Sequence, residues 1–171
     1  MKTVAFFGHR YILNERTIEE RLIKTLKDVL PQGFERLLIG CHGNFDNIAL
    51  LAGLNYRNKI DRNIKIEIVL TNRSFLNVDK YGNRKVDFYK NNGCDTVFYD
   101  IEEVYFKNRI IYSNKKMVDE SDLVICYVDM NSYKSGAKKA INYATKQKKP
   151  IINLFKVEDK MNSSNFCQFS I

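Results

Sequence analysis

Residues 122–154 read DLVICYVDMNSYKSGAKKAINYATKQKKPIINL, and the pattern of this stretch decides the fold class of the chain. Residues 123–128 are a continuous apolar run, which is typical of a strand covered on both faces. A polar loop with Gly136 follows, then an amphipathic helix, and then a second apolar run at 151–154. A strand, a helix and a strand in this order predict two parallel strands joined by a right-handed crossover.

The same alternation extends through the rest of the chain. Further apolar runs predict strands at 3–7, 36–39, 64–70 and 96–99, so we expect a sheet of about six strands. Helical periodicity predicts helices at 17–30, 46–60, 86–91 and 107–120. The first of them begins near Thr17, because Thr17 and Glu20 have the spacing of a capping box. The pattern therefore predicts an α/β fold with a mainly parallel sheet.

The chain length fits one domain with a substantial core, since 171 residues suffice to bury one. We expect residues 1–155 to form this domain. Residues 156–171 show no periodicity and are expected to form a C-terminal tail, either packed or frayed. The segment at 71–85 is polar and rich in turn formers, and loops of this length are usually functional or mobile.

The net charge of +8 and the pI of about 9.3 favour anionic partners, namely nucleotides, nucleic acid or acidic lipid headgroups. The lysines and arginines are spread along the chain instead of being massed in a tail. The alternative is therefore a Lys-rich surface that serves solubility alone.

The cysteines and the N-terminus indicate a cytoplasmic protein. Cys41, Cys94, Cys126 and Cys167 form no C-x-x-C pair, which suits reduced thiols better than disulfides or a zinc site. The apolar start at 3–7 is too short for a signal peptide. No apolar run approaches the roughly 20 residues of a membrane helix, so we expect no membrane partner.

Three loops that carry glycine follow three apolar strands, and in an open α/β sheet such loops gather at one edge. The first is Gly8-His9-Arg10, the second is the segment 40–44 with Gly43 and Asn44, and the third contains Ser135 and Gly136. Glycine lets the backbone approach a phosphate, and the following helix offers free amides. None of the loops has a Walker A or complete G-x-G-x-x-G pattern, so each could also be only a tight turn.

Arg10 and the two histidines are candidates in these loops. The guanidinium of Arg10 could hold a phosphate or carboxylate, or it could pair with a surface carboxylate. His9 and His42 could bind a metal or hydrogen-bond within the pocket, but only Cys41 and Asp46 are close in sequence as further ligands. We therefore expect no metal and no cofactor.

The remaining candidates surround the second and third loops. Asp46 is either an N-cap or a carboxylate that binds ribose hydroxyls or orients its loop. Ser132, Ser135 and Gly136 could cradle a phosphate, with Lys134 or Lys138 as the counter-charge. Tyr11 and Tyr133 could stack on a base. A Ser/His/Asp triad is not supported, because G-x-S-x-G is absent from the sequence.

Four pieces of this sequence, taken in order, resemble the SLOG superfamily, which joins the Smf/DprA proteins to the Lonely Guy phosphoribohydrolases. They are the strand that ends in Gly-His-Arg, the Gly-rich loop before Asp46, Asn-x-x-Met-Val-Asp-x-Ser-Asp at 114–122, and Ser-Gly-x-x-x-Ala-x-x-x-Ala at 135–144. The likeness is greatest to the small YpsA-like branch and covers most of residues 2–154.

The resemblance implies a Rossmann-like three-layer sandwich with a nucleotide or nucleotide-derived ligand at the strand ends. When the pocket positions of the family are transferred to this sequence, they fall in or beside all three loops. The pocket-lining residues that the resemblance implies are Gly8, His9, Arg10, Gly43, Asp46, Ser135 and Gly136. Relatives often pair through their helices, so a homo-oligomer is left open.

Two departures from the family bear on catalysis. The Lonely Guy enzymes have Gly-Gly-x-Gly-Thr-x-x-Glu, and here Ala137 and Ala140 replace the threonine and the glutamate. An alanine can neither move a proton nor stabilise an oxocarbenium ion, as this cleavage requires of a carboxylate. In the YpsA-like branch an arginine commonly precedes the helix asparagine, whereas Ser113 precedes Asn114 here.

We therefore predict a nucleotide-binding or nucleotide-sensing module with a phosphate site at the ends of strands 1, 2 and 5. The alternative is an enzyme, a nucleoside-monophosphate N-glycosidase whose acid is Asp46 or Asp129. A third hypothesis is binding of single-stranded nucleic acid, which the positive charge and the Smf/DprA likeness suggest. The lysines of the 134–149 region lie on several sides of their helix, which argues against a single binding face.

Overall fold

A computed structural model describes residues 1–99, 105, 108–132 and 135–159 of the chain. Its strands are β1 (Lys2–Gly8), β2 (Phe34–Ile39), β3 (Lys65–Leu70), β4 (Asp95–Phe98), β5 (Leu123–Tyr127) and β6 (Ile151–Asn153). Its α-helices are α1 (Glu15–Val29), α2 (Asn44–Lys59), α3 (Lys85–Asn91), α4 (Arg109–Glu120) and α5 (Gly136–Lys146). Short 3₁₀ turns follow α1 and β3, at Leu30–Gln32 and Arg73–Leu76.

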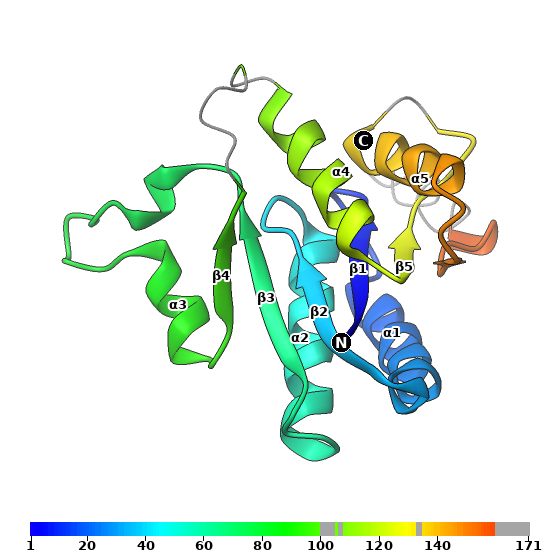
Figure 1. Cartoon of the computed structure of the whole chain (residues 1–171), viewed down its shortest axis with the longest axis horizontal. Helices are drawn as coiled ribbons and strands as arrows, with labels where there is room; N and C mark the ends of the chain where they lie inside the picture. Colours follow the sequence, from blue (N-terminus) through cyan, green and yellow to red (C-terminus); the bar gives the residue numbers. More distant parts are fainter. Residues whose placement is uncertain (100–104, 106–107, 133–134, 160–171) are drawn as a thin grey trace, which may run out of the picture.

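The six strands form one sheet in the order β4-β3-β2-β1-β5-β6, and every pairing between them is parallel (Figure 1). The predicted α/β fold with a parallel sheet of about six strands is therefore confirmed, and it is a Rossmann-like sandwich of three layers. The chain starts at the centre of the sheet, builds outward to β4, and then crosses to the other side of β1. The strand order thus reverses between β1 and β5, and open α/β sheets bind ligands at such a switch point.

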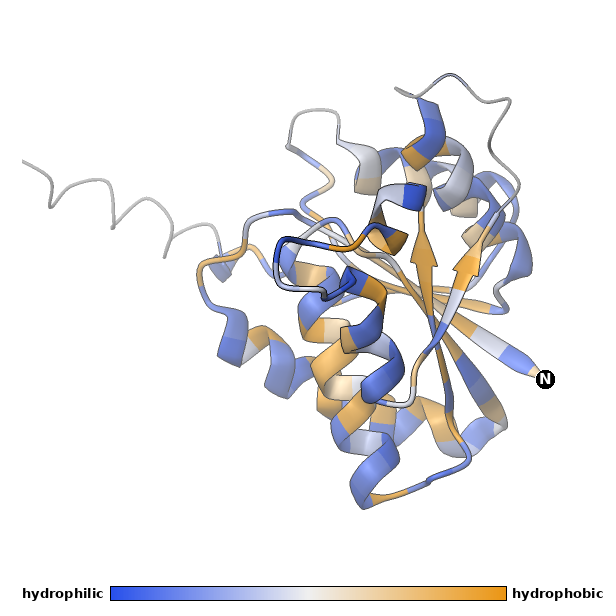
Figure 2. Cartoon of the chain, turned by 90° about the vertical axis from the view of Figure 1, so that its left-hand side faces the viewer, coloured by the Kyte–Doolittle hydropathy of each residue, from blue (hydrophilic) through white to orange (hydrophobic). Residues whose placement is uncertain are grey.

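The side chains of β1 divide the core between the two faces, because successive residues of a strand point in opposite directions. Val4 and Phe6 belong to a large buried cluster with α1 and α2, whereas Ala5 and Phe7 belong to a second cluster with α4 and α5. Figure 2 shows the apolar strands between these layers. The small residues of α5, Ala140 and Ala144, are buried, which lets this helix pack close to the sheet.

The first helix begins earlier than the sequence pattern predicts. It starts at Glu15 with Asn14 as the N-cap, so the predicted capping box of Thr17 and Glu20 is wrong. Both residues are exposed within the helix. The amide of Ile18 donates to the carbonyl of Asn14, and Glu15 in the first turn suits the positive end of the helix dipole.

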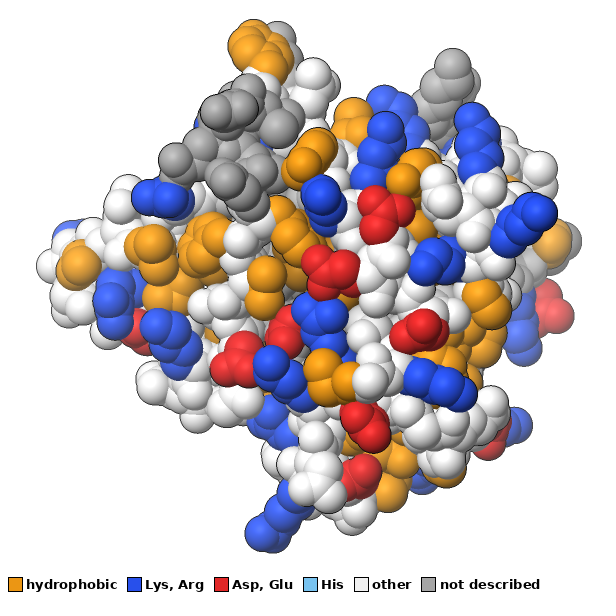
Figure 3. All heavy atoms as spheres, in the orientation of Figure 1, with side chains coloured by type: hydrophobic (Ala, Val, Ile, Leu, Met, Phe, Trp, Pro, Cys, Tyr) orange, Lys and Arg blue, Asp and Glu red, His pale blue; other side chains and the backbone are white. Residues whose placement is uncertain are grey.

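Charged side chains of both signs are interspersed on the face that Figure 3 presents, with no region of a single sign. One ionic cluster on the sheet is partly buried: Arg36 contacts Glu67 at 2.5 Å and Glu120 at 2.9 Å, which ties β2, β3 and the end of α4 together. Within the described residues, none of the helices has both the length and the apolar character needed to cross a membrane.

Candidate functional site

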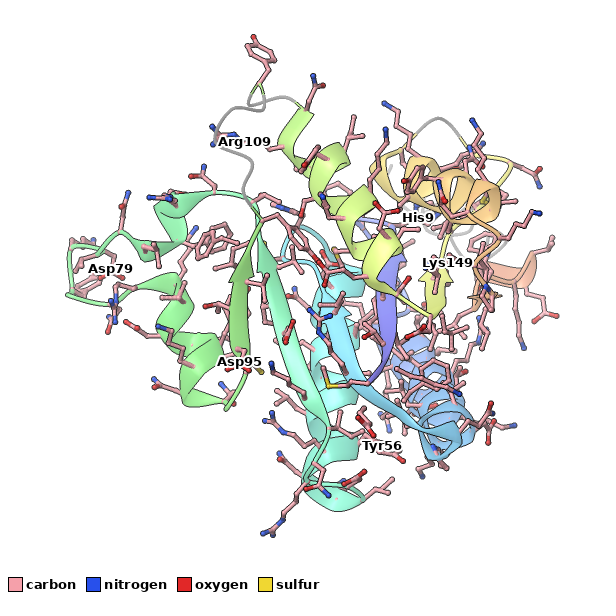
Figure 4. The ribbon with its side chains drawn as sticks, viewed as in Figure 1. His9, Tyr56, Asp79, Asp95, Arg109 and Lys149 are labelled. Atoms are coloured by element: carbon pink, nitrogen blue, oxygen red, sulfur yellow. The ribbon has the colours of Figure 1, made fainter. Side chains whose placement is uncertain are left out.

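A cavity of about 270 Å³ lies at the carboxyl edge of the sheet, beside the switch point. The ends of β1 and β2 form part of its wall, and α4 and the start of α5 form the rest. Figure 4 labels His9 in this region, near the end of β1 and beside α5. The lining residues are Phe6, Phe7, Gly8, His9, Arg10, Gly40, His42, Gly43, Asp46, Ile110, Asn114, Met117, Ser135, Gly136 and Ala137.

Two glycines let the first and second loops pack directly on each other. A Cβ at Gly8 would lie 2.2 Å from Cγ of the buried Phe45, and a Cβ at Gly43 would lie 2.8 Å from Cα of Arg10. The amide of Asn44 donates to the carbonyl of Arg10 at 2.9 Å. Since a side chain at either glycine would push the loops apart, the close approach requires glycine at both positions.

Asp46 organises the second loop from within α2. It is the third residue of the helix, whose N-cap is Gly43, so the N-cap interpretation of Asp46 is wrong. Its Oδ2 accepts hydrogen bonds from the amides of His42 at 2.7 Å and Gly43 at 3.0 Å. Burial raises the pKa of Asp46 to about 6, although these two amides and the charge of Arg10 favour the carboxylate.

His9 joins the first loop to the loop after β5. Its Nε2 accepts a hydrogen bond from the amide of Asp129 at 2.8 Å, and its own amide donates to the carbonyl of Tyr127 at 3.1 Å. Burial lowers the pKa of His9, although Asp129 opposes this. An imidazole that accepts at Nε2 carries its proton on Nδ1, so the geometry assigns the neutral Nδ1-H tautomer.

His42 makes the corresponding connection between β2 and β3. Its Nε2 lies 2.8 Å from the hydroxyl of Thr71, and burial followed by the positive charge of Arg10 lowers the pKa of His42. Each histidine therefore has a hydrogen-bonding partner in a neighbouring strand end. Among the described residues, no group of three or more His, Cys, Asp or Glu side chains is placed to hold a metal.

Arg10 supplies the positive charge of the cavity wall. Its side chain is exposed, and within the described part of the chain no carboxylate forms an ion pair with it. The alternative of a surface arginine paired with a helix carboxylate is thus not seen. The charge also reaches the cavity, because it adds to the lowering of the pKa of His42 and opposes the rise in the pKa of Asp46.

The start of α5 forms the opposite wall. Ser135 is the N-cap, and its Oγ accepts a hydrogen bond from the amide of Lys138 at 3.1 Å. Gly136 and Ala137 are the first two residues of the helix, whose amides have no acceptor within a helix. The Nζ of Lys138 donates to the carbonyl of Ser132 at 2.9 Å, so this lysine closes its loop and is not part of the cavity wall.

Some predicted site residues lie outside the cavity. The side-chain amide of Asn44 donates to Glu15, and Oδ1 of Asp129 accepts from the amide of Asn131 at 2.9 Å. Tyr11 is exposed and does not line the cavity. The predictions for Tyr133, Lys134 and most of the C-terminal tail fall outside the described residues.

The sequence interpretation missed the contribution of α4. Ile110, Asn114 and Met117 all line the cavity, and a Cβ at Gly136 would lie 4.0 Å from Nδ2 of Asn114. An asparagine on the otherwise apolar face of a helix was the available signal. Asn114 thus brings a hydrogen-bonding side chain close to the N-terminus of α5.

The two alanines that depart from the Lonely Guy signature occupy different places. Ala137 lines the cavity, whereas Ala140 is buried one turn further along α5 among core residues. The position that carries a glutamate in those enzymes therefore brings no ionisable group to this cavity.

No protein-family model and no curated protein matches the sequence. Among solved structures, DNA processing protein A (DprA) from Streptococcus pneumoniae resembles this chain with a TM-score of 0.60 and 17% sequence identity. The match covers 88% of this chain and 49% of the DprA chain, so this chain spans about half the length of that protein. The likeness shows that the chain has the fold of part of DprA.

Proposed function

We propose that this chain is a nucleotide-binding or nucleotide-sensing module of the SLOG superfamily, in its YpsA-like branch. The observation that carries the proposal is that Arg10 and the N-terminus of α5 line the same cavity of about 270 Å³. A guanidinium and free helix amides are two of the strongest phosphate-binding groups in proteins. The cavity is near the lower end of the volumes typical of small-molecule sites, which suits a ligand as small as one nucleotide.

The absence of a carboxylate at Ala140 favours binding over hydrolysis. Cleavage of an N-glycosidic bond needs a group that moves a proton or stabilises an oxocarbenium ion. Because Ala140 is buried and apolar, the α5 wall supplies no such group.

The proposal is tested by titrating nucleoside monophosphates into the protein and its Arg10→Ala variant by calorimetry. Loss of a charged hydrogen bond corresponds to about 1.5–3 kcal/mol, so we expect the variant to bind roughly 10- to 100-fold more weakly. Arg16→Ala is the matched control, because Arg16 is exposed on α1 and pairs only with Glu20 among the described residues. Equal affinity in the Arg10 variant and the control would remove Arg10 from the site.

The ligand itself can be sought without a candidate library. Mass spectrometry of small molecules that co-purify with the native protein would identify a bound nucleotide or nucleotide derivative. A phosphate-bearing compound retained by the wild type and lost from Arg10→Ala supports the proposal. Retention of only uncharged compounds by both proteins contradicts it.

One observation favours the N-glycosidase as a second candidate. Asp46 lines the cavity with a pKa raised to about 6, and a general acid works best when its pKa is near the operating pH. Asp129 has no such support, because it does not line the cavity. Incubation with purine and pyrimidine monophosphates, followed by chromatography of released base, separates the two functions. Sustained turnover that disappears in Asp46→Asn would establish the enzyme and overturn the sensing module.

Nucleic-acid binding is the third candidate, and the likeness to DprA is the observation in its favour. The lysines around α5 give it little support. Lys138 donates to the carbonyl of Ser132, and Lys149, labelled in Figure 4, donates to the carbonyls of Asp119 and Ser121. Filter binding of single-stranded DNA at two salt concentrations tests this candidate, since phosphate contacts make affinity fall steeply with salt.

The proposal includes a cytoplasmic location and one folded domain at residues 1–155. The cysteines that the structure describes, Cys41, Cys94 and Cys126, are free thiols, which is consistent with a reducing compartment. Fractionation of the native protein tests the location, and limited proteolysis tests the domain boundary.

A further inference from the structure

The segment that follows β6 is fixed to α1 by a two-point ion pair. Nη1 and Nη2 of Arg21 lie 2.8 and 3.0 Å from the two carboxylate oxygens of Asp159. Nη1 also donates to the carbonyl of Leu154 at 3.3 Å, and the amide of Lys156 donates to Asp159 at 2.9 Å. The Asp159 side chain is only 6% exposed, so this is a shielded pair of the bidentate kind that fixes geometry.

An aromatic cluster connects this ion pair to the cavity. The rings of Phe155 and Tyr127 pack edge to face with centroids 5.3 Å apart. Both rings also make T-shaped contacts with the ring of His9, with centroid distances of 6.2 Å for Phe155 and 6.0 Å for Tyr127. Burial and the neighbouring Asp159 raise the pKa of Tyr127 to about 12, so its hydroxyl stays neutral beside the carboxylate.

The aromatic cluster touches His9, a residue of the cavity wall, and restricts the orientation of its ring. His9 has to present Nε2 to the amide of Asp129, and that bond joins the loops after β1 and β5. Protonation would turn the acceptor Nε2 into a donor, and a flip of the ring would put a C–H group in its place, so either change would break the bond. Two aromatic rings packed nearly perpendicular to the imidazole, at 83° and 89°, oppose such a flip.

We propose that residues 154–159 form a positioning strap for the ligand site, in which Phe155 and the Arg21–Asp159 pair hold His9 in its Nε2-accepting orientation. The strap contributes none of the residues that line the cavity. It acts through His9, so Phe155, Arg21 and Asp159 are positioning residues. The effect on ligand affinity rests on the proposed function, whereas the effect on His9 does not.

The first readout is the tautomer of His9 in the full-length, ligand-free protein, observed by long-range ¹H–¹⁵N NMR. The wild type is expected to show the single Nδ1-H form. Asp159→Asn and Phe155→Leu are expected to show a mixture of tautomers, while Arg16→Gln, which breaks an exposed pair on the same helix, leaves His9 unchanged. An unchanged His9 in both strap variants would overturn the proposal.

The second readout is affinity for inorganic phosphate, followed at the amide of Gly136 in the same samples. Perturbation of a contact network between two sites changes affinity by about 2- to 30-fold, and we expect a loss within this range in the strap variants. Altered His9 tautomers with undiminished phosphate affinity would overturn the coupling to the site. Failure of the wild type to bind phosphate would count against the proposed function, while the tautomers would still decide whether the strap positions His9.

Discussion

Replacing Asp46 by asparagine tests the electrostatics of the cavity without changing its shape. Oδ2 of Asp46 accepts hydrogen bonds from the amides of His42 and Gly43, and the side-chain oxygen of asparagine can accept the same two bonds. The substitution removes the negative charge and replaces Oδ1 with an amide group of nearly the same size. Because burial raises the pKa of Asp46, that charge costs the folded protein free energy whenever the group is ionised.

The size and sign of the effect follow from the raised pKa. The pKa of Asp46 rises from 3.8 to about 6, so the folded protein binds the proton of this carboxyl more tightly than the unfolded chain does. Its contribution to stability is therefore complete below pH 4 and is lost as the pH rises through about 6. Two pKa units correspond to about 3 kcal/mol, which is an upper limit because the carboxyl borders an open cavity. We expect the stability of Asp46→Asn relative to the wild type to rise by up to this amount between pH 4 and pH 7.

The measurement is urea unfolding of both proteins at several pH values from 4 to 7.5. All other titrating groups contribute equally to both proteins, so the difference in unfolding free energy isolates Asp46. A difference that stays constant would show that Asp46 titrates normally. A difference that falls as the pH rises would show that the carboxylate is stabilised, and the reasoning about burial would then be wrong.

Three further predictions concern packing, a helix end and thiol chemistry. Gly8→Ala places a Cβ 2.2 Å from the buried ring of Phe45, so we expect thermal unfolding to show a loss of about 3 kcal/mol or more. Lys148 lies two residues beyond the end of α5 with a φ of 55°, a conformation that favours glycine, so Lys148→Gly should raise stability by about 1 kcal/mol in the same assay. Burial raises the pKa values of Cys41 and Cys126 to about 12, so iodoacetamide at pH 8 should label both far more slowly than free cysteine, and rapid labelling of either would contradict its burial.

The order of strands and helices could be predicted because apolar runs and helical periodicity are local signals. The helix starts were less predictable, since they depend on contacts made in the folded chain. The start of α2 is set by the bonds from His42 and Gly43 to Asp46 and by the bond from Asn44 to Arg10, which comes from another loop. Sequence periodicity carries no information on such a bond, and it placed the helix two residues late, at Asp46.

The candidate site was predictable where it depends on the loops and unpredictable where it depends on helix packing. Glycine after an apolar strand marked Gly8, Gly43 and Gly136, and all three line the cavity. Ile110 and Met117 look like ordinary core residues of an amphipathic helix. They line the cavity because α4 crosses the end of β1, and that crossing is set by the packing of the whole layer.

The glycine loops differ in what they leave available to a ligand. In the second loop the amides of His42, Gly43 and Asn44 all donate to acceptors within the protein, so this loop holds the site together and has little left to offer an anion. At α5, the Ser135 hydroxyl accepts from the amide of Lys138, and the amides of the first two helical residues stay at the cavity wall. Because a helix N-terminus attracts negative charge, an anionic group would bind at α5 and not at α2. The carboxylate of Asp46 on the α2 side of the cavity strengthens this preference for α5, because its negative charge repels an anion that approaches from that side.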